Sequence, residues 1–373
     1  MKFEFHLPTK VIFYPGSLEV LGEKTAKLGG KCLVVTGRTF ARKYGYIDRM
    51  RELLEASNVK VEFFSRVEPN PSFQTVEEGA ELVKKIGVDV IVGFGGGSAM
   101  DAAKAIALLA SKGEHIRDYV GVPVDEEDVI PIIAVPTTCG TGSEVTKYSV
   151  LTDVENKRKV VVLGYSILPR VAILDPTILK HLPSHLVAYT GFDALSHAME
   201  AFISKKSQPV SDIFALESIK LIFKYLRRAV KRDFQALEMM HYASMLAGVA
   251  INFAGTTIVH GLGYYLTVYH DIHHGLANAL LLPYMLEFNA PIVPEKMERM
   301  AEILKISSDK LVEEVMKLRK ATGIPENLKK VGVSEEEIGK MVEEAMSYSR
   351  NLSNNPREVT PEDVEKIYRK AFT

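Results

Sequence analysis

The stretch VIVGFGGGSAMDAAKAIALL, residues 90–109, decides the fold of the first half of the chain. Its pattern predicts a buried strand, then a turn at Gly95-Gly96-Gly97-Ser98, then a helix. Glycines let backbone N–H groups approach a phosphate at a helix N-terminus, where the helix dipole favours negative charge. The turn lacks the spaced GxGxxG fingerprint and the lysine of a P-loop, so by itself it indicates either a phosphate site or a tight turn.

Short β-branched runs alternate with longer amphipathic segments on both sides of this stretch. The alternation predicts a mostly parallel sheet covered by helices on both faces. Strands are expected at 31–36, 59–64, 88–95, 130–136, 160–163 and 171–175. Helices are expected at 17–29, 47–57, 75–87 and 99–113. The segment 147–153, together with the run 160–163, is expected to form an antiparallel excursion.

A second turn, rich in glycine and hydroxyl groups, follows the strand predicted at 130–136. Ligands of parallel α/β sheets bind beyond the carboxyl ends of the strands, so the two turns together can form a diphosphate cradle. Neither turn contains the GxSxG elbow of a hydrolase. The hydroxyl candidates of this segment are Thr137, Thr138, Thr141, Ser143 and Thr146.

The first of these strands ends at Gly37-Arg38, in LVVTGRTF (33–40). In dinucleotide sites an acidic residue at such a position binds the adenosine ribose hydroxyls, whereas an arginine suits a 2′-phosphate. No acid is present here. Arg38 is therefore either a cofactor contact or an ordinary surface arginine.

The pattern changes near residue 180. We find no convincing strand from about residue 184 onward, and segments such as 210–231 and 361–372 have helical periodicity. The sequence therefore predicts an α/β domain at 1–180, followed by an all-helical domain at 181–373.

Bulk composition narrows the classes of protein. The chain has 373 residues and a net charge of −1, so no global field favours nucleic acid or an anionic membrane. Its two cysteines, Cys32 and Cys139, lie in apolar or glycine-rich surroundings, which indicates a reducing cytoplasm. Residues 242–269 carry no Lys, Arg, Asp or Glu. We interpret that stretch as a buried core helix rather than a membrane span, because it contains polar residues and four glycines.

The second half offers one carboxylate and three imidazoles for a metal. Asp193 and His197, in GFDALSHAMEAF (191–202), are four residues apart and share a helix face. His260 and His274 follow in VHGLGYYLTVYHDIHHG (259–275). Such a set suits Fe²⁺ or Zn²⁺ better than Mg²⁺ or Ca²⁺, which prefer oxygen ligands. Each histidine taken singly could equally be a hydrogen-bonded core residue.

Together these motifs resemble the iron-containing, group III alcohol dehydrogenases, in order, over at least residues 8–290. The signatures are VEPNPS (67–72), GGGSAMDAAKA (95–105), PTTCGTGSE (136–144), ILDP (173–176), TGFDALSHAMEAF (190–202) and HGLG…HHGLANALLLP (260–283).

The resemblance implies an N-terminal dinucleotide-binding α/β domain, a helical C-terminal domain and an active site in the cleft between them. It implies that Asp193, His197, His260 and His274 hold the metal, usually Fe²⁺ and in some members Zn²⁺. The implied cofactor contacts are Gly95, Gly96, Gly97, Ser98, Asp101, Thr137, Thr138, Asn70 and Lys159.

The implied reaction is hydride transfer between a small primary alcohol or diol and C4 of a nicotinamide, assisted by the Lewis acidity of the ion. Family members form dimers and larger assemblies, so a homo-oligomer is expected, with no nucleic-acid or membrane partner.

Two departures from the family pattern matter. Many relatives carry Asp where this chain has Gly37, so we favour NADP over NAD as cofactor. Many also carry a further histidine four residues after the third ligand, where this chain has Tyr264. The proton relay is then Tyr264, His270 or bound water, and the catalytic set comprises these side chains with His260 and His274.

Three alternatives stay open from the sequence. The same fold serves glycerol-dehydrogenase-like polyol enzymes and dehydroquinate-synthase-like lyases. His270-Asp271 is an HD dipeptide, as in a class of metal phosphohydrolases, although that alternative leaves the first half unexplained. A non-catalytic metal- or nucleotide-binding protein is the third.

Overall fold

A computed structural model of the chain describes residues 3–113, 115–126 and 128–373. The described chain divides into two compact units. Unit 2 contains His6–Thr138 and Gly142–Leu182. Unit 1 contains Pro183–Thr373, the short segment Cys139–Thr141 and the described N-terminal residues through Phe5. The loop after the strand that ends at Pro136 therefore leaves unit 2 for three residues and then returns to it.

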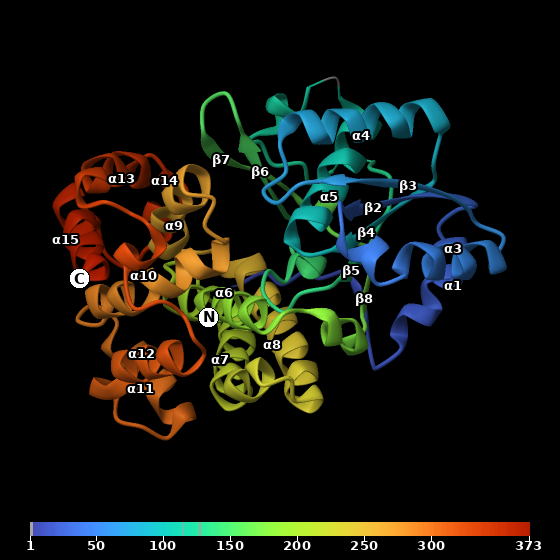
Figure 1. The fold of residues 1–373 in the computed structure, drawn as a ribbon. Helices are drawn as coiled ribbons and strands as arrows, with labels where there is room; N and C mark the ends of the chain where they lie inside the picture. The colour runs from blue at the N-terminus through green and yellow to red at the C-terminus, as the bar shows by residue number, and fades with distance from the viewer. Residues whose placement is uncertain (1–2, 114, 127) are drawn as a thin grey trace. The chain divides into compact units, whose positions relative to one another are not determined.

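Unit 2 is built on a six-stranded sheet with the order β1-β8-β5-β4-β2-β3 (Figure 1). All of its pairings are parallel, which confirms the predicted α/β class. The strands are β1 Lys10–Phe13, β2 Lys31–Gly37, β3 Lys60–Val67, β4 Val90–Gly95, β5 Ile132–Pro136 and β8 Val171–Leu174.

Strand β1 is the one strand of this sheet that the sequence did not reveal. It has only four residues, and none of them is fully buried, so its apolar pattern is weak. It is held by β8, with Lys10 opposite Val171. This pairing joins distant parts of the chain, which local pattern cannot report.

Alternation along β2 explains how both faces of the sheet are covered. Leu33 and Val35 belong to one apolar core, which includes side chains of α4 and α5. Cys32 and Val34 point into the other core, with side chains of α1 and α3. The helices of unit 2 are α1 Leu21–Ala26, α2 Phe40–Lys43, α3 Tyr46–Ala56, α4 Phe73–Ile86 and α5 Gly97–Lys112, and the 3-10 turns are η1 Ser17–Val20, η2 Ile116–Tyr119, η3 Ser143–Val145, η4 Tyr165–Ile167 and η5 Pro176–His181.

The predicted antiparallel excursion is confirmed as a separate hairpin of β6 Tyr148–Asp153 and β7 Arg158–Leu163. The helix predicted at 17–29 is wrong in its first turn, which is the 3-10 turn η1. Asp175 accepts hydrogen bonds from the backbone N–H groups of Gly16 and Leu18 there.

The described part of unit 1 contains helices and no strand, as the sequence predicts. Helix α6 packs against α7, α8 and α10. The helices are α6 Ser184–Ile203, α7 Pro209–Val230, α8 Phe234–Ala254, α9 Ile258–Tyr269, α10 His274–Asn289, α11 Pro294–Leu304, α12 Leu311–Ala321, α13 Ile338–Met346, α14 Ser349–Asn354 and α15 Pro361–Phe372, with 3-10 turns η6 Ser308–Lys310, η7 Leu328–Val331 and η8 Glu335–Glu337.

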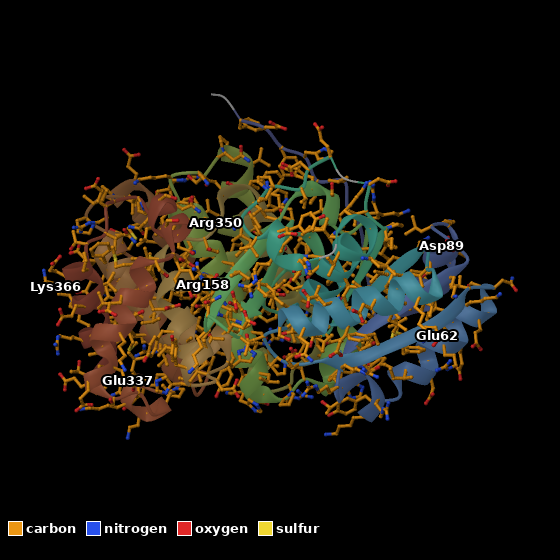
Figure 2. All side chains as sticks on the ribbon, turned by 90° about the horizontal axis from the view of Figure 1, so that it is seen from above. Glu62, Asp89, Arg158, Glu337, Arg350 and Lys366 are labelled. Carbon is orange, nitrogen blue, oxygen red and sulfur yellow. The ribbon has the colours of Figure 1, made fainter. Side chains whose placement is uncertain are left out.

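The uncharged stretch 242–269 forms parts of two helices instead of the single helix expected. The chain breaks between α8 and α9, where Gly255 has a φ of 67°. No single described helix is both long and apolar enough to cross a membrane, and α8 with α9 meets that test only as a pair bent by 111°. Charged side chains such as Glu62 and Lys366 project outward from their own units (Figure 2).

A buried polar network fixes α5 beside the hairpin and the second turn. The ammonium group of Lys104 is fully buried and donates to Ser143 Oγ at 2.7 Å, to Thr146 Oγ1 at 3.3 Å and to the Tyr148 carbonyl at 2.8 Å. Burial lowers the pKa of Lys104 to about 8. Burial also raises the pKa of neighbouring Glu144 to about 7. Glu144 Oε1 has no hydrogen-bond partner among the described residues.

Glu144 should therefore make unit 2 less stable as pH rises. A carboxyl group whose pKa is raised in the folded state stabilises fully below its unfolded pKa and loses that contribution as pH rises through about 7. For Glu144→Gln we expect the free energy of unfolding to depend less on pH. Between pH 5 and pH 8 the variant should lose up to about 3 kcal/mol less of this free energy than the wild type. Calorimetric melting of both proteins at the two pH values measures this difference. Glu155→Gln, at a side chain that is 81% exposed, is the control and should keep the wild-type profile.

Candidate metal centre

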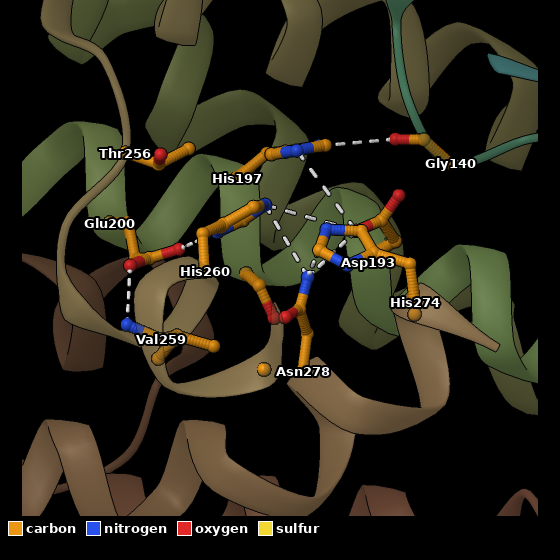
Figure 3. A network of polar contacts seen from close by, with 12 residues as sticks. Gly140, Asp193, His197, Glu200, Thr256, Val259, His260, His274 and Asn278 are labelled. Carbon is orange, nitrogen blue, oxygen red and sulfur yellow. Dashed lines mark hydrogen bonds and ion pairs between the residues drawn. The ribbon is translucent and has the colours of Figure 1, made fainter. Parts of the chain in front are cut away.

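The inner face of α6 supplies two of the predicted ligands (Figure 3). Asp193 and His197 are one helical turn apart, with exposed fractions of 2% and 6%. His197 Nε2 lies 4.0 Å from Asp193 Oδ1. Because α6 is buried along almost its whole length, these polar side chains must find partners within unit 1.

The other two predicted ligands come from α9 and from the first residue of α10. His260 is buried on α9, whereas the His274 side chain is 26% exposed. Gly275 explains the close approach of α10 to α6, because a Cβ there would lie 2.1 Å from the Tyr189 carbonyl oxygen. His273 Nδ1 accepts the Gly275 N–H and fixes the start of α10.

Three of the four side chains converge on one point, and His197 lies beside them. Asp193, His260 and His274 each offer a ligand atom, and these atoms lie within 4.8 Å of one another. From Asp193 Oδ1 the distance is 3.9 Å to His260 Nε2 and 3.8 Å to His274 Nε2. Ligands that surround one ion at bonds of about 2.1 Å are roughly 3.5 Å apart. The spacing thus suits one ion after a small contraction.

Hydrogen bonds to the outer ring nitrogens leave Nε2 of two histidines available. His197 Nδ1 contacts the Gly140 carbonyl at 3.3 Å, so it is the protonated, donating nitrogen. His260 Nδ1 contacts the Glu200 carboxylate, and an ionised carboxylate only accepts, so this nitrogen also carries the hydrogen. In both rings Nε2 is then the lone-pair nitrogen that a metal requires.

The electrostatics of the cluster favour a cation. Burial opposes ionisation of Asp193, but His197, His274 and His260 lower its pKa, so the carboxylate form is retained. Burial lowers the pKa of His197 and favours the neutral ring. Burial also opposes the charged form of His260, yet Glu200 raises its pKa. A cation at this point would replace that proton.

The amide of Asn278 supplies a further indication of what this cluster binds. Its Nδ2 donates to Asp193 Oδ1 at 2.9 Å and lies 3.3 Å from His260 Nε2 and 3.1 Å from His274 Nε2. One electropositive group thus faces a carboxylate oxygen and two ring nitrogens at once. A divalent cation has the same polarity, so the donor set fits a metal of the Fe²⁺ or Zn²⁺ type.

In unit 2 the structure brings the two cofactor turns side by side. The Thr137 N–H donates to the Gly95 carbonyl at 2.9 Å. A Cβ at Gly96 would lie 3.3 Å from Thr138 Cγ2, so a larger residue would crowd the second turn. Two other candidates join this group, because the Asn70 N–H donates to Ser98 Oγ and Lys159 Nζ donates to Asn70 Oδ1.

The remaining cofactor candidates have different surroundings. Asp101 accepts hydrogen bonds from Ser143 Oγ at 2.6 Å and from the Val150 N–H at 3.0 Å, so it links the two turns. Thr146 is buried against Lys104, and Thr141 lies in the three-residue segment that belongs to unit 1.

A cavity of about 580 Å³ lies beside the end of β2. Gly37 ends this strand, and Arg38 Nε donates to the Arg66 carbonyl at 3.1 Å. The side chains of both arginines are largely exposed, at 65% and 74%. The cavity is lined by Arg38, Arg66, Glu68, Ser72, Gln74 and Glu78, among others.

The two candidates for the proton relay, Tyr264 and His270, have different partners. The ring of Tyr264 stacks on that of His274, with centroids 5.8 Å apart and an interplanar angle of 18°. His270 Nε2 instead pairs with Glu337 Oε1 at 2.8 Å and is not part of the ligand group found among the described residues.

Sequence reasoning missed three residues of this machinery: Glu200, Asn278 and Lys104. Two of them carried a local signal. Glu200 follows Asp193 by seven residues and Asn278 follows His274 by four, so each shares a helix face with a ligand. Lys104 follows the predicted cofactor residue Asp101 by three residues on α5, but its hydrogen-bond partners Ser143, Thr146 and Tyr148 come from another part of the chain.

Comparison with known proteins was decisive. Residues 8–176 match the family model described as iron-containing alcohol dehydrogenase. Residues 187–372 match the C-terminal model of the Fe-containing alcohol dehydrogenase family. The chain belongs to the iron-containing alcohol dehydrogenase family.

Similar proteins are known over the full length of this alcohol dehydrogenase. An NAD-dependent methanol dehydrogenase of Bacillus methanolicus is 34% identical, over 99% of each chain. An NADPH-dependent butanol dehydrogenase of Clostridium saccharobutylicum is 33% identical, over 98% of this chain and 96% of its own. The crystal structure of a 1,3-propanediol oxidoreductase matches with a TM-score of 0.95 and 37% identity, over 100% of both chains.

The family match makes the chain an NAD(P)-dependent oxidoreductase of the alcohol dehydrogenase class. The phosphohydrolase and non-catalytic alternatives are therefore wrong. His270 of the HD dipeptide is hydrogen-bonded to Glu337 instead.

Proposed function

We propose that this dehydrogenase interconverts a small primary alcohol or diol and its aldehyde, with NADP as cofactor and Fe²⁺ as the resident ion. Zn²⁺ could take the same place. The observation that carries the proposal is the convergence of Asp193, His260 and His274 within 4.8 Å, with His197 beside them. Together with the family match, this donor set favours metal-assisted alcohol chemistry.

The ion, the cofactor and the surrounding residues have different roles in the proposed reaction. When bound, the ion supplies Lewis acidity towards the oxygen of the substrate, and the nicotinamide accepts or returns the hydride. Asp193 and the three histidines would hold the ion, and the burial of Asp193, His197 and His260 shields it from water on their side. The more exposed His274 marks the accessible side, so we place substrate entry there.

For the cofactor, we propose that the diphosphate binds to the turn Gly95-Gly96-Gly97-Ser98, with Thr137 and Thr138 beside it. The hydrogen bond from the Thr137 N–H to the Gly95 carbonyl, which connects the two turns, and the one from the Asn70 N–H to Ser98 Oγ support this assignment. Asn70 and Lys159 extend the same group of side chains.

The preference for NADP rests on Gly37 and its neighbours. Named relatives use either cofactor, so the family alone does not decide. Gly37 itself carries no carboxylate at the end of β2. The exposed guanidinium groups of Arg38 and Arg66 line the adjoining cavity, where they lie 3.8 Å and 3.7 Å from the carboxylates of Glu68 and Glu78, so a 2′-phosphate would exchange for these surface pairs. An arginine fork suits a 2′-phosphate.

The expected setting is a homo-oligomer, such as a dimer, in the cytoplasm. Both cysteines are buried free thiols, which supports a reducing compartment.

A panel of small alcohols, diols and aldehydes, followed by NADPH absorbance at 340 nm, tests the function. We expect turnover with the iron-loaded protein and its loss after metal removal. His260→Ala should weaken metal binding by more than about 100-fold and abolish turnover, because it removes a ligand outright. NADPH affinity, measured separately, should stay near that of the wild type. Full activity of the metal-stripped protein would refute the metal-assisted mechanism.

Gly37→Asp tests the cofactor preference. A Cβ at Gly37 has only the Val67 carbonyl oxygen nearby, at 3.7 Å, so a side chain fits there. The new carboxylate should repel a 2′-phosphate and lower the NADP/NAD ratio of kcat/KM by about 10-fold or more. Gly37→Ala adds a Cβ without the charge and serves as the control. An unchanged ratio in Gly37→Asp would contradict the charge argument.

Tyr264→Phe tests the proton relay. We propose that the Tyr264 hydroxyl moves the proton, because its ring stacks on His274. Its loss should lower kcat by about 100-fold or more and change the pH profile, with metal content unchanged. The parallel variant is His270→Gln. A large effect there, with little effect in Tyr264→Phe, would transfer the relay to His270.

A further inference from the structure

Glu200 is a buried carboxylate that the metal site does not use directly. It lies on α6, one turn beyond His197, and its exposed fraction is 0%. Its Oε1 accepts the Thr257 N–H at 2.9 Å, the Thr257 hydroxyl at 2.8 Å and the Val259 N–H at 2.9 Å. Its Oε2 accepts from His260 Nδ1 (Figure 3).

These contacts define the ionic form and the orientation of Glu200. The three partners of Oε1 are donors, so this oxygen accepts three hydrogen bonds, which favour the carboxylate form. Oε2 faces a different neighbour, the Nδ1 atom of His260. Oε1 binds the residues that begin α9, where the helix dipole also favours a negative charge. Oε2 contacts the imidazole ring of His260, the residue of α9 that belongs to the ligand cluster.

We infer that Glu200 is the positioning residue of His260. Its carboxylate keeps the hydrogen on Nδ1 and thereby leaves Nε2, 3.9 Å from Asp193 Oδ1, free to bind the ion. A carboxylate behind a ligating imidazole fixes the tautomer and the ring plane, and it makes the imidazole a stronger donor to the metal. The inference rests on the proposed metal site.

One helix therefore supplies three residues in two layers of the same site: two proposed ligands and the carboxylate behind a third ligand. Asp193, His197 and Glu200 follow one another at spacings of four and three residues along the buried face of α6. The alternative is that Glu200 serves only to cap α9. The two roles use different oxygens, so a single substitution can separate them.

Glu200→Gln makes that separation. The amide oxygen of the glutamine can still accept the hydrogen bonds from Thr257 and Val259. If the amide were turned the other way, its NH₂ group would face these three donors, which is unfavourable. The NH₂ group must then face His260 Nδ1, which can accept only when its hydrogen moves to Nε2. The cap of α9 is preserved while the ligand tautomer is inverted.

The experiment uses the full chain, stripped of metal and titrated with Co²⁺, with Nε2 ligation followed in the visible spectrum. For Glu200→Gln we expect a melting temperature of the metal-free protein near that of the wild type, and a 10- to 100-fold weaker affinity for Co²⁺ with an altered spectrum. Thr257→Val removes one donor from Oε1 only. This control should lower the melting temperature and leave the Co²⁺ spectrum unchanged.

Wild-type affinity and spectrum in Glu200→Gln would overturn the inference. A second measurement needs no variant: ¹⁵N NMR of histidine in the Zn²⁺-loaded wild type should show His260 protonated at Nδ1, and protonation at Nε2 would also overturn it. If the wild type itself fails to bind Co²⁺ or Zn²⁺, then the proposed metal site fails, which is a separate result.

Discussion

Polar side chains lie along a face of α6 that is shielded from water, and unit 1 is arranged to satisfy them. A buried carboxylate or imidazole without a partner would cost several kcal/mol, so its neighbours must supply donors, acceptors or a cation. Asp193 faces the imidazoles and the amide of Asn278, whereas Glu200 faces the first residues of α9. The same requirement that satisfies these groups also fixes where α9 and α10 pack.

Close packing supports this arrangement at the positions where helices meet. Gly275 lets α10 approach the backbone of α6, and Gly263 leaves room for the Asn278 amide, since a Cβ there would lie 2.8 Å from its oxygen. In unit 2 the buried ammonium group of Lys104 also fixes how neighbouring elements pack. Lys104 uses its protons to bind three acceptors around the second turn, so α5 and that turn are held in one geometry.

Much of the fold could be predicted because its signals are local. The buried strand at 90–95, the glycine turn and α5 follow each other directly, and the change to helices near residue 180 is visible in periodicity. The predicted ligands Asp193 and His197 share a helix face for the same reason. The short strand β1 and the 3-10 start of the first helical segment depend on β8 and on Asp175, more than 150 residues away, and could not be predicted.

The sequence by itself determined the class of each half, the ligand types and the two turns, because helical and strand periodicity are properties of neighbouring residues. Only the tertiary structure decided which side chains share one point. In it, His274 and His260 lie close to Asp193, and His270 contacts Glu337. Glu200 contacts the side of the His260 ring that faces away from the cluster. The physical reason is that hydrogen bonds between helices depend on how those helices pack, and no spacing along the chain records that packing.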